Sequence, residues 1–484
     1  MTTLSIDTHR EIASWDQEAK KEDNSKYFWE TPDLDLLRSG KKSFVISRKG
    51  TGKTAIGQRL LRASATTDFA QALSFRNYPF NDLYKSLKDP SYRAHNQYIS
   101  GWQFLIYCSV AKLMASDPTT DPELRTLFGR VFEIDPTETL ARRFARWISG
   151  GVKFGVEGIG VVEVKLARQI MSGSHSFDDR VQALKKLIIP SLKASKYYVI
   201  FDELDEDFVG SSSQEDRKEY FALLTALFKA VELVKDDTKS KFGCVLPVVL
   251  LRDDIYKKLG DNDREKWASS SARVDWSMDK IKQLVGFRLS RAAGIEPPHS
   301  FAQVWPLMVG PALRYTVSGK QWDKFDFIGS YTLMRPRDFI FYLSQCSQKV
   351  VEKHAARRGG LELSGEILKD SVREFAQHLK AELEDEIGGQ MPYIGGVLDA
   401  LLGQGERDFT AAEFRALYEN NRKKTHDIAW SADADSVLEL LFNFSAVGYR
   451  RGKQDVFRYL SPSSDLDSNR TLLLHKGLFG ARRV

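Results

Sequence analysis

The segment SRKGTGKT, at residues 47–54, has the glycines, lysine and threonine of a loop that binds phosphate. The two glycines allow the backbone to turn its amide groups inward around an anion. Lys53 is then placed to reach the β- and γ-phosphates of ATP, and the Thr54 hydroxyl to ligate Mg²⁺. The residues predicted to hold the nucleotide in this loop are Ser47, Arg48, Lys49, Gly50, Thr51, Gly52, Lys53, Thr54 and Ala55.

The sequence on either side of the loop suits the same role. The preceding SFVI is apolar enough for a buried strand, and the following AIGQRLL has the period of an amphipathic helix. That helix would direct the positive end of its dipole at the phosphates. Ser47 stands where the usual pattern has glycine, and a serine fits there if its φ is negative. The alternative is a glycine-rich turn that holds no ligand.

A second apolar run, KYYVIFDELDEDF, ends in acidic residues. Tyr197 to Phe201 reads as a strand, with Asp202 at its carboxyl end. Asp202 is expected to hold Mg²⁺, and Glu203 to orient or deprotonate the water that attacks the γ-phosphate. Asp205 and Glu206 extend the cluster. The alternative is a strand that ends in a solvated acidic turn.

Three arginines are candidates for contacting the nucleotide. Arg252 ends a third apolar strand at 244–251, which is expected beside the loop strand, and it could sense the γ-phosphate. Arg335 and Arg337 begin an apolar-periodic helix and could fold over a bound nucleotide. A surface arginine at 252, and an ion pair with Asp338 at the helix start, are the alternatives.

Composition limits the class of protein. The chain has 484 residues, of which 42% are hydrophobic and 28% charged, and its net charge of +6 is spread along the sequence. No window approaches 18 uncharged apolar residues, so no membrane span is expected. The first residues lack the apolar stretch of a signal peptide. Cys108, Cys244 and Cys346 lie far apart and are expected to be reduced core residues, which predicts a cytoplasmic protein.

The predicted fold class is α/β. It comprises a P-loop NTPase core with a parallel sheet of the additional-strand type, a helical lid and a C-terminal winged helix. More than 120 residues separate the second strand from Asp202, which is far too long for a simple crossover, so an insertion is expected there. The predicted parts are an arm at 1–40, the core at 41–275 with an insertion at about 84–195 that includes a β-hairpin at 152–167, the lid at 276–390, and the winged helix with a basic tail at 391–484.

The predicted wing could contact duplex DNA. Its basic residues are Arg450, Arg451, Lys453 and Arg458. The third helix of this module opens with Asp433 and Asp435, which would repel phosphate, so a protein-binding role stays open beside DNA binding.

The sequence also leaves open whether one subunit supplies a catalytic arginine to the site of its neighbour. Its candidates are Arg264, Arg273, Arg288 and Arg291.

Taken together, these motifs resemble the AAA+/STAND-like family of prokaryotic P-loop ATPases. Within it they resemble a cyanobacterial-type group with a GRKGTGKSA-like loop and, more distantly, the Orc/Cdc6-type initiator ATPases. The resemblance spans about residues 27 to 345. It rests on SRKGTGKTA (47–55), FRNYPF (75–80), VIFDELDE (199–206), LRDDIYKKL (251–259), RVDWS (273–277) and RPRDFIFYL (335–343). Two departures matter: Ser47 replaces glycine, and the acidic motif leaves the water-activating residue open among Glu203, Asp205 and Glu206.

The sequence and its resemblance together predict an ATP-binding and ATP-hydrolysing switch that uses Mg²⁺. The resemblance implies self-assembly and, for many relatives, a place in anti-phage defence through a separate effector protein. A DNA-binding or DNA-loading ATPase of the initiator kind is the first alternative. A nucleotide-binding scaffold that does not hydrolyse ATP is the second.

Overall fold

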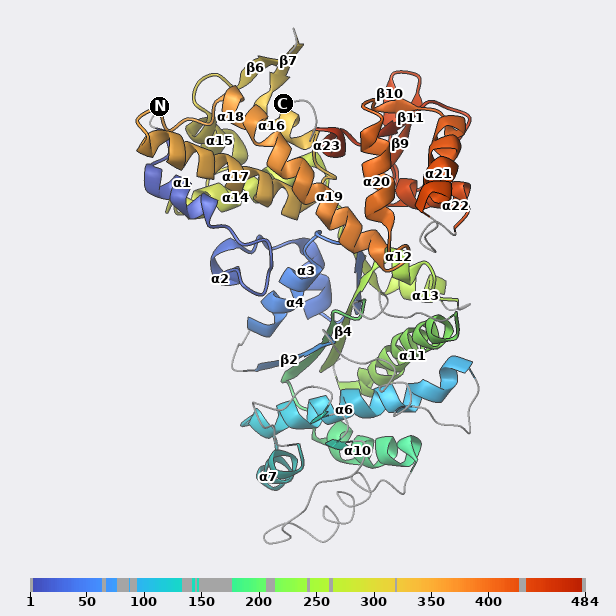
Figure 1. Cartoon of the computed structure of the whole chain (residues 1–484). Helices are drawn as coiled ribbons and strands as arrows, with labels where there is room; N and C mark the ends of the chain where they lie inside the picture. The colour runs from blue at the N-terminus through green and yellow to red at the C-terminus, as the bar shows by residue number, and fades with distance from the viewer. Residues whose placement is uncertain are drawn as a thin grey trace. The chain divides into compact units, whose positions relative to one another are not determined.

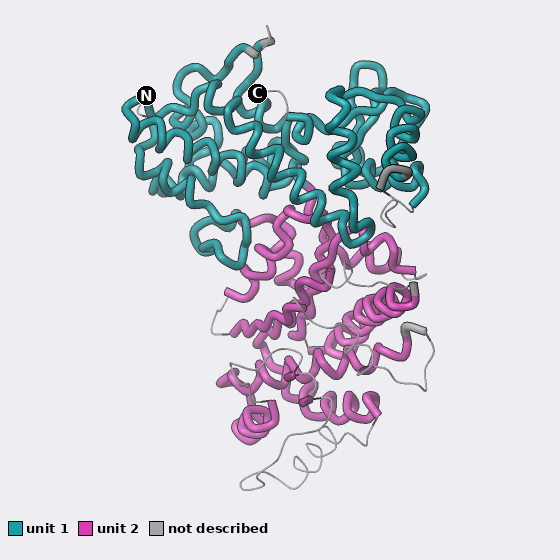
Figure 2. The backbone as a smooth tube through the Cα atoms, in the orientation of Figure 1, with its two compact units in different colours: residues 1–29, 276–484 teal, residues 30–275 magenta. Residues whose placement is uncertain are grey.

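In the computed structural model, the chain forms two compact units (Figure 2). One unit joins Met1–Trp29 to Trp276–Val484, and the other is Glu30–Asp275. The described residues are 3–62, 67–75, 87, 94–132, 142–143, 146–147, 176–205, 214–241, 244–260, 264–317, 320–425 and 432–480. The hairpin predicted at 152–167 and the candidate base Glu206 lie outside them.

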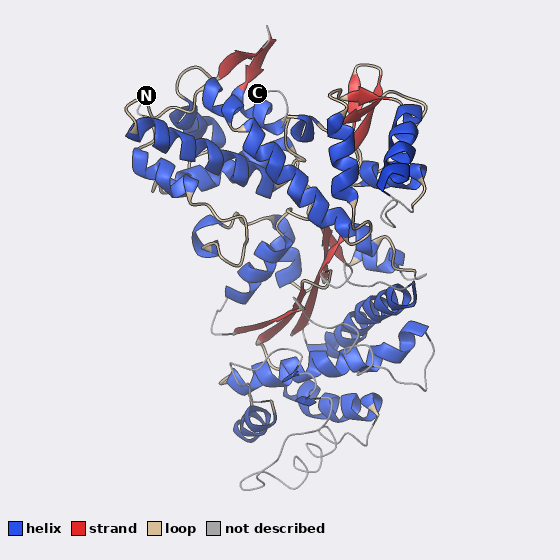
Figure 3. Ribbon diagram, in the orientation of Figure 1, coloured by secondary structure: helices blue, strands red, loops and turns tan. Residues whose placement is uncertain are grey.

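The unit formed by Glu30–Asp275 is built on a parallel five-stranded sheet. Its strands, drawn in red in Figure 3, are β1 (Phe44–Ser47), β2 (Asp68–Ser74), β3 (Lys196–Asp202), β4 (Val245–Arg252) and β5 (Ser271–Arg273). Their order in the sheet is β2-β3-β4-β1-β5. Strand β4 lies between the loop strand β1 and the acidic strand β3, with all pairs parallel. This is the inserted strand that the sequence predicts, and the arrangement is consistent with a P-loop NTPase fold.

Helices cover both faces of this sheet, which explains why β3 and β4 are buried along nearly their whole length. In Figure 1, α3 and α4 lie on one face, with α6 and α11 on the other. Helix α6 is apolar all round and packs between α10, α11 and the sheet. The bounds are α3 Pro32–Arg38, α4 Lys53–Arg62, α6 Ile99–Ser116, α7 Pro122–Val131, α10 Phe177–Ser191, α11 Gln214–Thr238, α12 Asp253–Tyr256 and α13 Arg264–Ser269.

The other unit is mostly helical. Its first part comprises α1 Ile6–Ala13, α2 Asn24–Tyr27, α14 Met278–Ala292, α15 Phe301–Val309, the hairpin β6 Arg314–Val317 and β7 Lys320–Asp323, α16 Lys324–Gly329, α17 Pro336–Ala355, α18 Gly365–Asp370 and α19 Val372–Gly388. Helix α1 packs against α17. There His9 Nε2 donates a hydrogen bond to the Leu361 carbonyl (2.8 Å), and Nδ1 lies 3.3 Å from Ser347 Oγ.

The last part of the same unit has three helices followed by a β-hairpin, in the order that the sequence predicts. It comprises α20 Ile394–Gly403, β8 Asp408–Phe409, α21 Ala411–Thr425, α22 Ala434–Asn443, β9 Val447–Arg451, β10 Gln454–Val456, β11 Leu472–Leu474 and α23 Lys476–Phe479. The antiparallel sheet has the order β10-β9-β11-β8. The two-residue hairpin turn begins at Gly452, whose φ of 63° suits the first position of a type II′ turn.

Helix α23 is attached to the preceding helical part through an ammonium group among aromatic rings. Lys476 Nζ lies 4.0 Å from the ring centroid of Tyr331, 4.5 Å from that of Trp322 and 5.1 Å from that of Phe327. The same nitrogen donates a hydrogen bond to Ser330 Oγ (2.8 Å). Cation–π attraction of this kind stabilises the contact by about 0.5–2 kcal/mol. These residues are called the Lys476 cage below.

Two expectations concern the chain as a whole. Cys108, Cys244 and Cys346 are buried and unpaired, as the sequence predicts. Among the helices that the structure describes, none is both long enough and apolar enough to cross a membrane.

Candidate nucleotide-binding site

The loop after β1 has the backbone of an anion-binding turn. Gly50 has φ 78° and Gly52 has φ 101°, a left-handed region that favours glycine. Ser47 is the last residue of β1 and keeps the extended backbone of a strand. The condition under which serine can replace glycine here is therefore met.

Lys53 begins helix α4, and its side chain crosses back over the loop. Its ammonium donates hydrogen bonds to the carbonyls of Ser47 (2.9 Å) and Arg48 (2.8 Å). The ammonium is thus held by two carbonyls of the loop. It can exchange carbonyl oxygens for phosphate oxygens, because both are hydrogen-bond acceptors.

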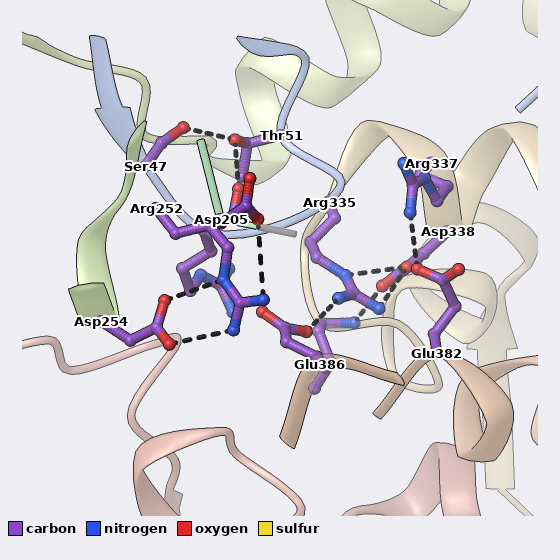
Figure 4. Close-up of polar contacts among 12 residues, drawn as sticks. Ser47, Thr51, Asp205, Arg252, Asp254, Arg335, Arg337, Asp338, Glu382 and Glu386 are labelled. Carbon is purple, nitrogen blue, oxygen red and sulfur yellow. Dashed lines mark hydrogen bonds and ion pairs between the residues drawn. The ribbon is translucent and has the colours of Figure 1, made fainter. Parts of the chain in front are cut away.

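Two hydroxyls link Ser47, where the loop begins, to Thr51, which lies between its two glycines. Ser47 Oγ lies 2.6 Å from Thr51 Oγ1, and Thr51 Oγ1 donates to the Arg48 carbonyl (2.8 Å). Figure 4 shows the Ser47 and Thr51 side chains pointing toward one another. Both residues are buried, with 5% and 3% of their surface exposed.

The two residues predicted to hold Mg²⁺ converge. Thr54 Oγ1 lies 3.4 Å from Asp202 Oδ1, although β3 and α4 are far apart in the sequence. A hydroxyl and a carboxylate are ligands that suit Mg²⁺, which usually takes few protein oxygens together with substrate phosphates and water. Among the described residues there is no group of three or more His, Cys, Asp or Glu side chains placed to hold a metal. The Thr54–Asp202 pair is the donor set that fits.

Glu203 has an unusual backbone and a partner from another strand. Its φ is 59°, and its amide donates a hydrogen bond to Asp202 Oδ1 (2.9 Å). Ser74 Oγ donates to Glu203 Oε2. Ser74 ends β2 and pairs with Asp202 in the parallel register, so it lies at the same edge of the sheet. Ser74 could not be identified from the sequence, because the acidic motif around Glu203 does not show which residue ends the neighbouring strand.

Arg252 lies beside the loop strand, as predicted, since it pairs with Ser47 in the β1–β4 register. Only 5% of its surface is exposed. Its guanidinium donates two hydrogen bonds to Asp254 (3.0 and 2.9 Å) and lies 3.7 Å from Asp205 (Figure 4). It is therefore not the surface arginine that was the alternative. Asp205, one candidate base, is engaged with this arginine.

Asp253, between Arg252 and Asp254, also belongs to the surroundings of the loop. Burial acts to raise the pKa of its carboxyl, but the charge and hydrogen bond of Lys257, followed by the charges of Arg48 and Lys53, hold that pKa below its usual value. The ionised Asp253 carboxylate lowers the net positive charge around Arg48 and Lys53. No motif in the sequence singled it out.

Arg335 and Arg337 lie in the other unit, where both form ion pairs within that unit. Arg335 is 1% exposed and contacts Asp338 (2.9 Å) and Glu386 (3.2 Å). Arg337 contacts Glu382 at 2.7 Å (Figure 4). The alternative considered from the sequence, an ion pair of Arg335 with Asp338, is present.

The basic residues of the predicted wing fall into two groups. Arg450 contacts Asp408 (2.6 Å) and Asp455 (3.5 Å). Arg458 donates to the Ser464 carbonyl and lies 3.6 Å from Asp465. In contrast, Arg451 and Lys453 are exposed at the tip of the β9–β10 hairpin.

One candidate for a trans arginine is buried inside its own unit. Arg288 is 2% exposed and donates to Glu22 (2.9 Å), and its guanidinium lies over the rings of Trp15 (4.6 Å) and Tyr27 (4.7 Å). These contacts fasten the N-terminal segment to α14.

Comparison with known proteins gives distant relatives. No family model matches the chain. The chain is 20% identical over 490 residues to the putative transposon gamma-delta 80.3 kDa protein of Escherichia coli (strain K12). That match covers 93% of this chain and 64% of the relative, so the chain spans less than two thirds of the relative's length. The crystal structure of Cdc6p from Pyrobaculum aerophilum matches over 94% of each chain, with 13% identity and a TM-score of 0.29. A score this low does not establish a common fold.

Proposed function

We propose that this chain binds ATP with Mg²⁺ and hydrolyses it as a nucleotide-controlled switch. The observation that carries the proposal is the contact of Thr54 with Asp202. It lies beside a loop in which the Lys53 ammonium is hydrogen-bonded to the loop's own carbonyls. Parallel sheets of this kind place their ligands at the carboxyl ends of the strands, and every residue of the set lies at that edge.

The residues of the site have separate roles in this proposal. Lys53 transfers its hydrogen bonds from the loop carbonyls to the β- and γ-phosphates. Thr54 and Asp202 hold Mg²⁺, which when bound neutralises charge on the phosphates. Glu203 releases Ser74 and accepts a proton from the attacking water. Arg252 turns from Asp254 toward the γ-phosphate, which makes it a sensor of hydrolysis.

Two substitutions test this proposal. Lys53→Ala is expected to abolish ATP binding measured by calorimetry, because a charge-assisted contact to phosphate is lost. Glu203→Gln is expected to retain ATP and to lower kcat by about 10²- to 10⁴-fold, the range for removal of a general base. Lys41→Ala, an exposed lysine that precedes β1 at the end opposite the loop, is the control. Normal turnover by Glu203→Gln would exclude Glu203 as the base and leave Asp205 or Glu206.

DNA-directed hydrolysis is a second candidate function. Exposed Arg451 and Lys453 at the tip of a hairpin that follows three helices support a winged helix that touches phosphate through its wing. The name of the Escherichia coli relative, a putative transposon protein, is compatible with work on DNA. This function predicts that duplex DNA stimulates ATP turnover, that salt weakens the effect, and that Arg451→Ala with Lys453→Ala removes it. Lys424→Ala, outside the hairpin, is the control.

The finer biological roles remain predictions from the resemblance. These are membership of the STAND-like group, self-assembly, and anti-phage defence through a separate effector. The contact of Arg335 and Arg337 with the nucleotide, argued from their place at a helix start, also stays a prediction. A scaffold that binds ATP without hydrolysis would give nucleotide binding with no Lys53-dependent turnover.

A further inference from the structure

The protons of the two loop hydroxyls can be assigned from the geometry. A threonine hydroxyl has one proton, and that of Thr51 is directed at the Arg48 carbonyl. The 2.6 Å contact between Ser47 and Thr51 must therefore use the Ser47 proton, with Thr51 Oγ1 as acceptor. The result is a directed chain from Ser47 to Thr51 to the Arg48 carbonyl, which we call the hydroxyl brace.

The brace lies beside the two glycines of the loop. Gly50 lies inside the segment that it closes, and Gly52 follows immediately, both with positive φ. Glycine loses more backbone freedom on ordering than any other residue. A loop that is ordered before the nucleotide arrives does not have to lose that freedom on binding, so its affinity is higher.

The brace also prepares the loop for movement of Lys53. The Arg48 carbonyl accepts from both Thr51 Oγ1 (2.8 Å) and Lys53 Nζ (2.8 Å). When Lys53 turns to phosphate, the Thr51 hydroxyl stays on that carbonyl. A carbonyl that loses its donor away from water is destabilised, so the second donor lowers the cost of the lysine's departure.

From these contacts we infer that Ser47 and Thr51 are positioning residues that hold the phosphate loop in its binding conformation. The inference rests on the proposed function, because the loop's ligand is the phosphate chain of ATP. It predicts that Ser47→Gly, which restores the common motif, weakens nucleotide binding. A glycine at this position supplies no hydroxyl to Thr51.

The first experiment measures ADP binding with Mg²⁺ by calorimetry, together with kcat and KM for ATP. Ser47→Gly, Ser47→Ala and Thr51→Val are each expected to weaken ADP binding about 3- to 10-fold, the worth of one neutral hydrogen bond. KM should rise with kcat little changed. Thr51→Ser keeps the hydroxyl and should bind ADP more tightly than Thr51→Val. The double variant Ser47→Ala/Thr51→Val should be no weaker than Thr51→Val alone, because the two side chains act as one unit.

The second experiment needs no nucleotide. Hydrogen exchange of the loop amides should be faster in Ser47→Gly, Ser47→Ala and Thr51→Val than in the wild type, and unchanged in Thr51→Ser. Equal exchange in all of these proteins would overturn the brace, as would additive losses in the double variant or ADP binding by Ser47→Gly as tight as the wild type. If the wild type bound no nucleotide while the exchange differences appeared, the brace would stand and the proposed function would fail.

Discussion

Glu203 shows how a catalytic candidate can be held by a residue from another strand. Its carboxylate accepts a hydrogen bond from Ser74, while its own amide is bonded to Asp202. The Ser74 hydroxyl thus occupies one oxygen of the proposed base, and Glu203 must give up this hydrogen bond before that oxygen can accept one from water.

Replacing Ser74 should therefore alter turnover more than binding. Ser74→Ala is expected to raise basal kcat for ATP about 2- to 10-fold, because the carboxylate loses one neutral hydrogen-bond donor. Steady-state hydrolysis with saturating ATP measures this change. Ser74→Thr retains the hydroxyl and should match the wild type. A fall in kcat for Ser74→Ala would instead mean that the serine orients Glu203 for the reaction.

Features of the site that depend on residues close together in the sequence could be predicted, whereas those that depend on contacts between distant segments could not. The loop was predictable, because glycine, lysine and threonine at fixed spacing determine a local structure. Asp202 was predictable as the end of an apolar run. Ser74 and Asp253 were not, since their roles arise from strand register and from charges on other segments. Nor could the motif show that Arg252 is held by two carboxylates.

At the scale of elements, the place of β4 beside the loop strand and the order of helices in the C-terminal part agree with the sequence-based expectation. The uninterrupted apolar runs of β3 and β4 are typical of a sheet covered on both faces. The position of α1 did not follow. The structure groups Met1–Trp29 with Trp276–Val484, and the residues from Glu30 onward with the other unit. Helix α1 is held by its contact with α17, and no local sequence pattern identifies α17 as its packing partner.

The contact of α1 with α17 makes stability depend on pH. Burial lowers the pKa of His9 below its ordinary value of 6.5, although the Leu361 carbonyl partly opposes this shift. As pH falls through 6.5, the unfolded chain binds a proton that the folded state refuses, so the free energy of unfolding decreases.

Unfolding measured between about pH 7.5 and about pH 5.5 should show this loss. His9→Gln should flatten the slope without abolishing it, because His378 has its pKa lowered in the same direction, mainly by burial. A slope in His9→Gln equal to that of the wild type would contradict the assignment.

For the whole molecule, the division into units predicts where ATP acts on stability. The loop, Asp202, Glu203 and Arg252 all belong to Glu30–Asp275. A ligand that binds the native state adds about 2.7 kcal/mol at 100 times its Kd. ATP with Mg²⁺ should therefore protect peptides of residues 30–275 from hydrogen exchange and proteolysis, and Lys53→Ala should remove the protection. Equal protection of residues 276–480 would mean that the two units unfold together.

The Lys476 cage has a consequence for the order of events during synthesis. Trp322, Phe327 and Tyr331 leave the ribosome well before Lys476, whose ammonium lies against their rings. Chains grow from the N-terminus and earlier parts begin to fold first. The side of these rings that Lys476 contacts therefore stays uncovered in the nascent chain until residue 476 has emerged. A product terminated before residue 476 would keep it exposed, as a site where chaperones or proteases can distinguish it from the longer chain.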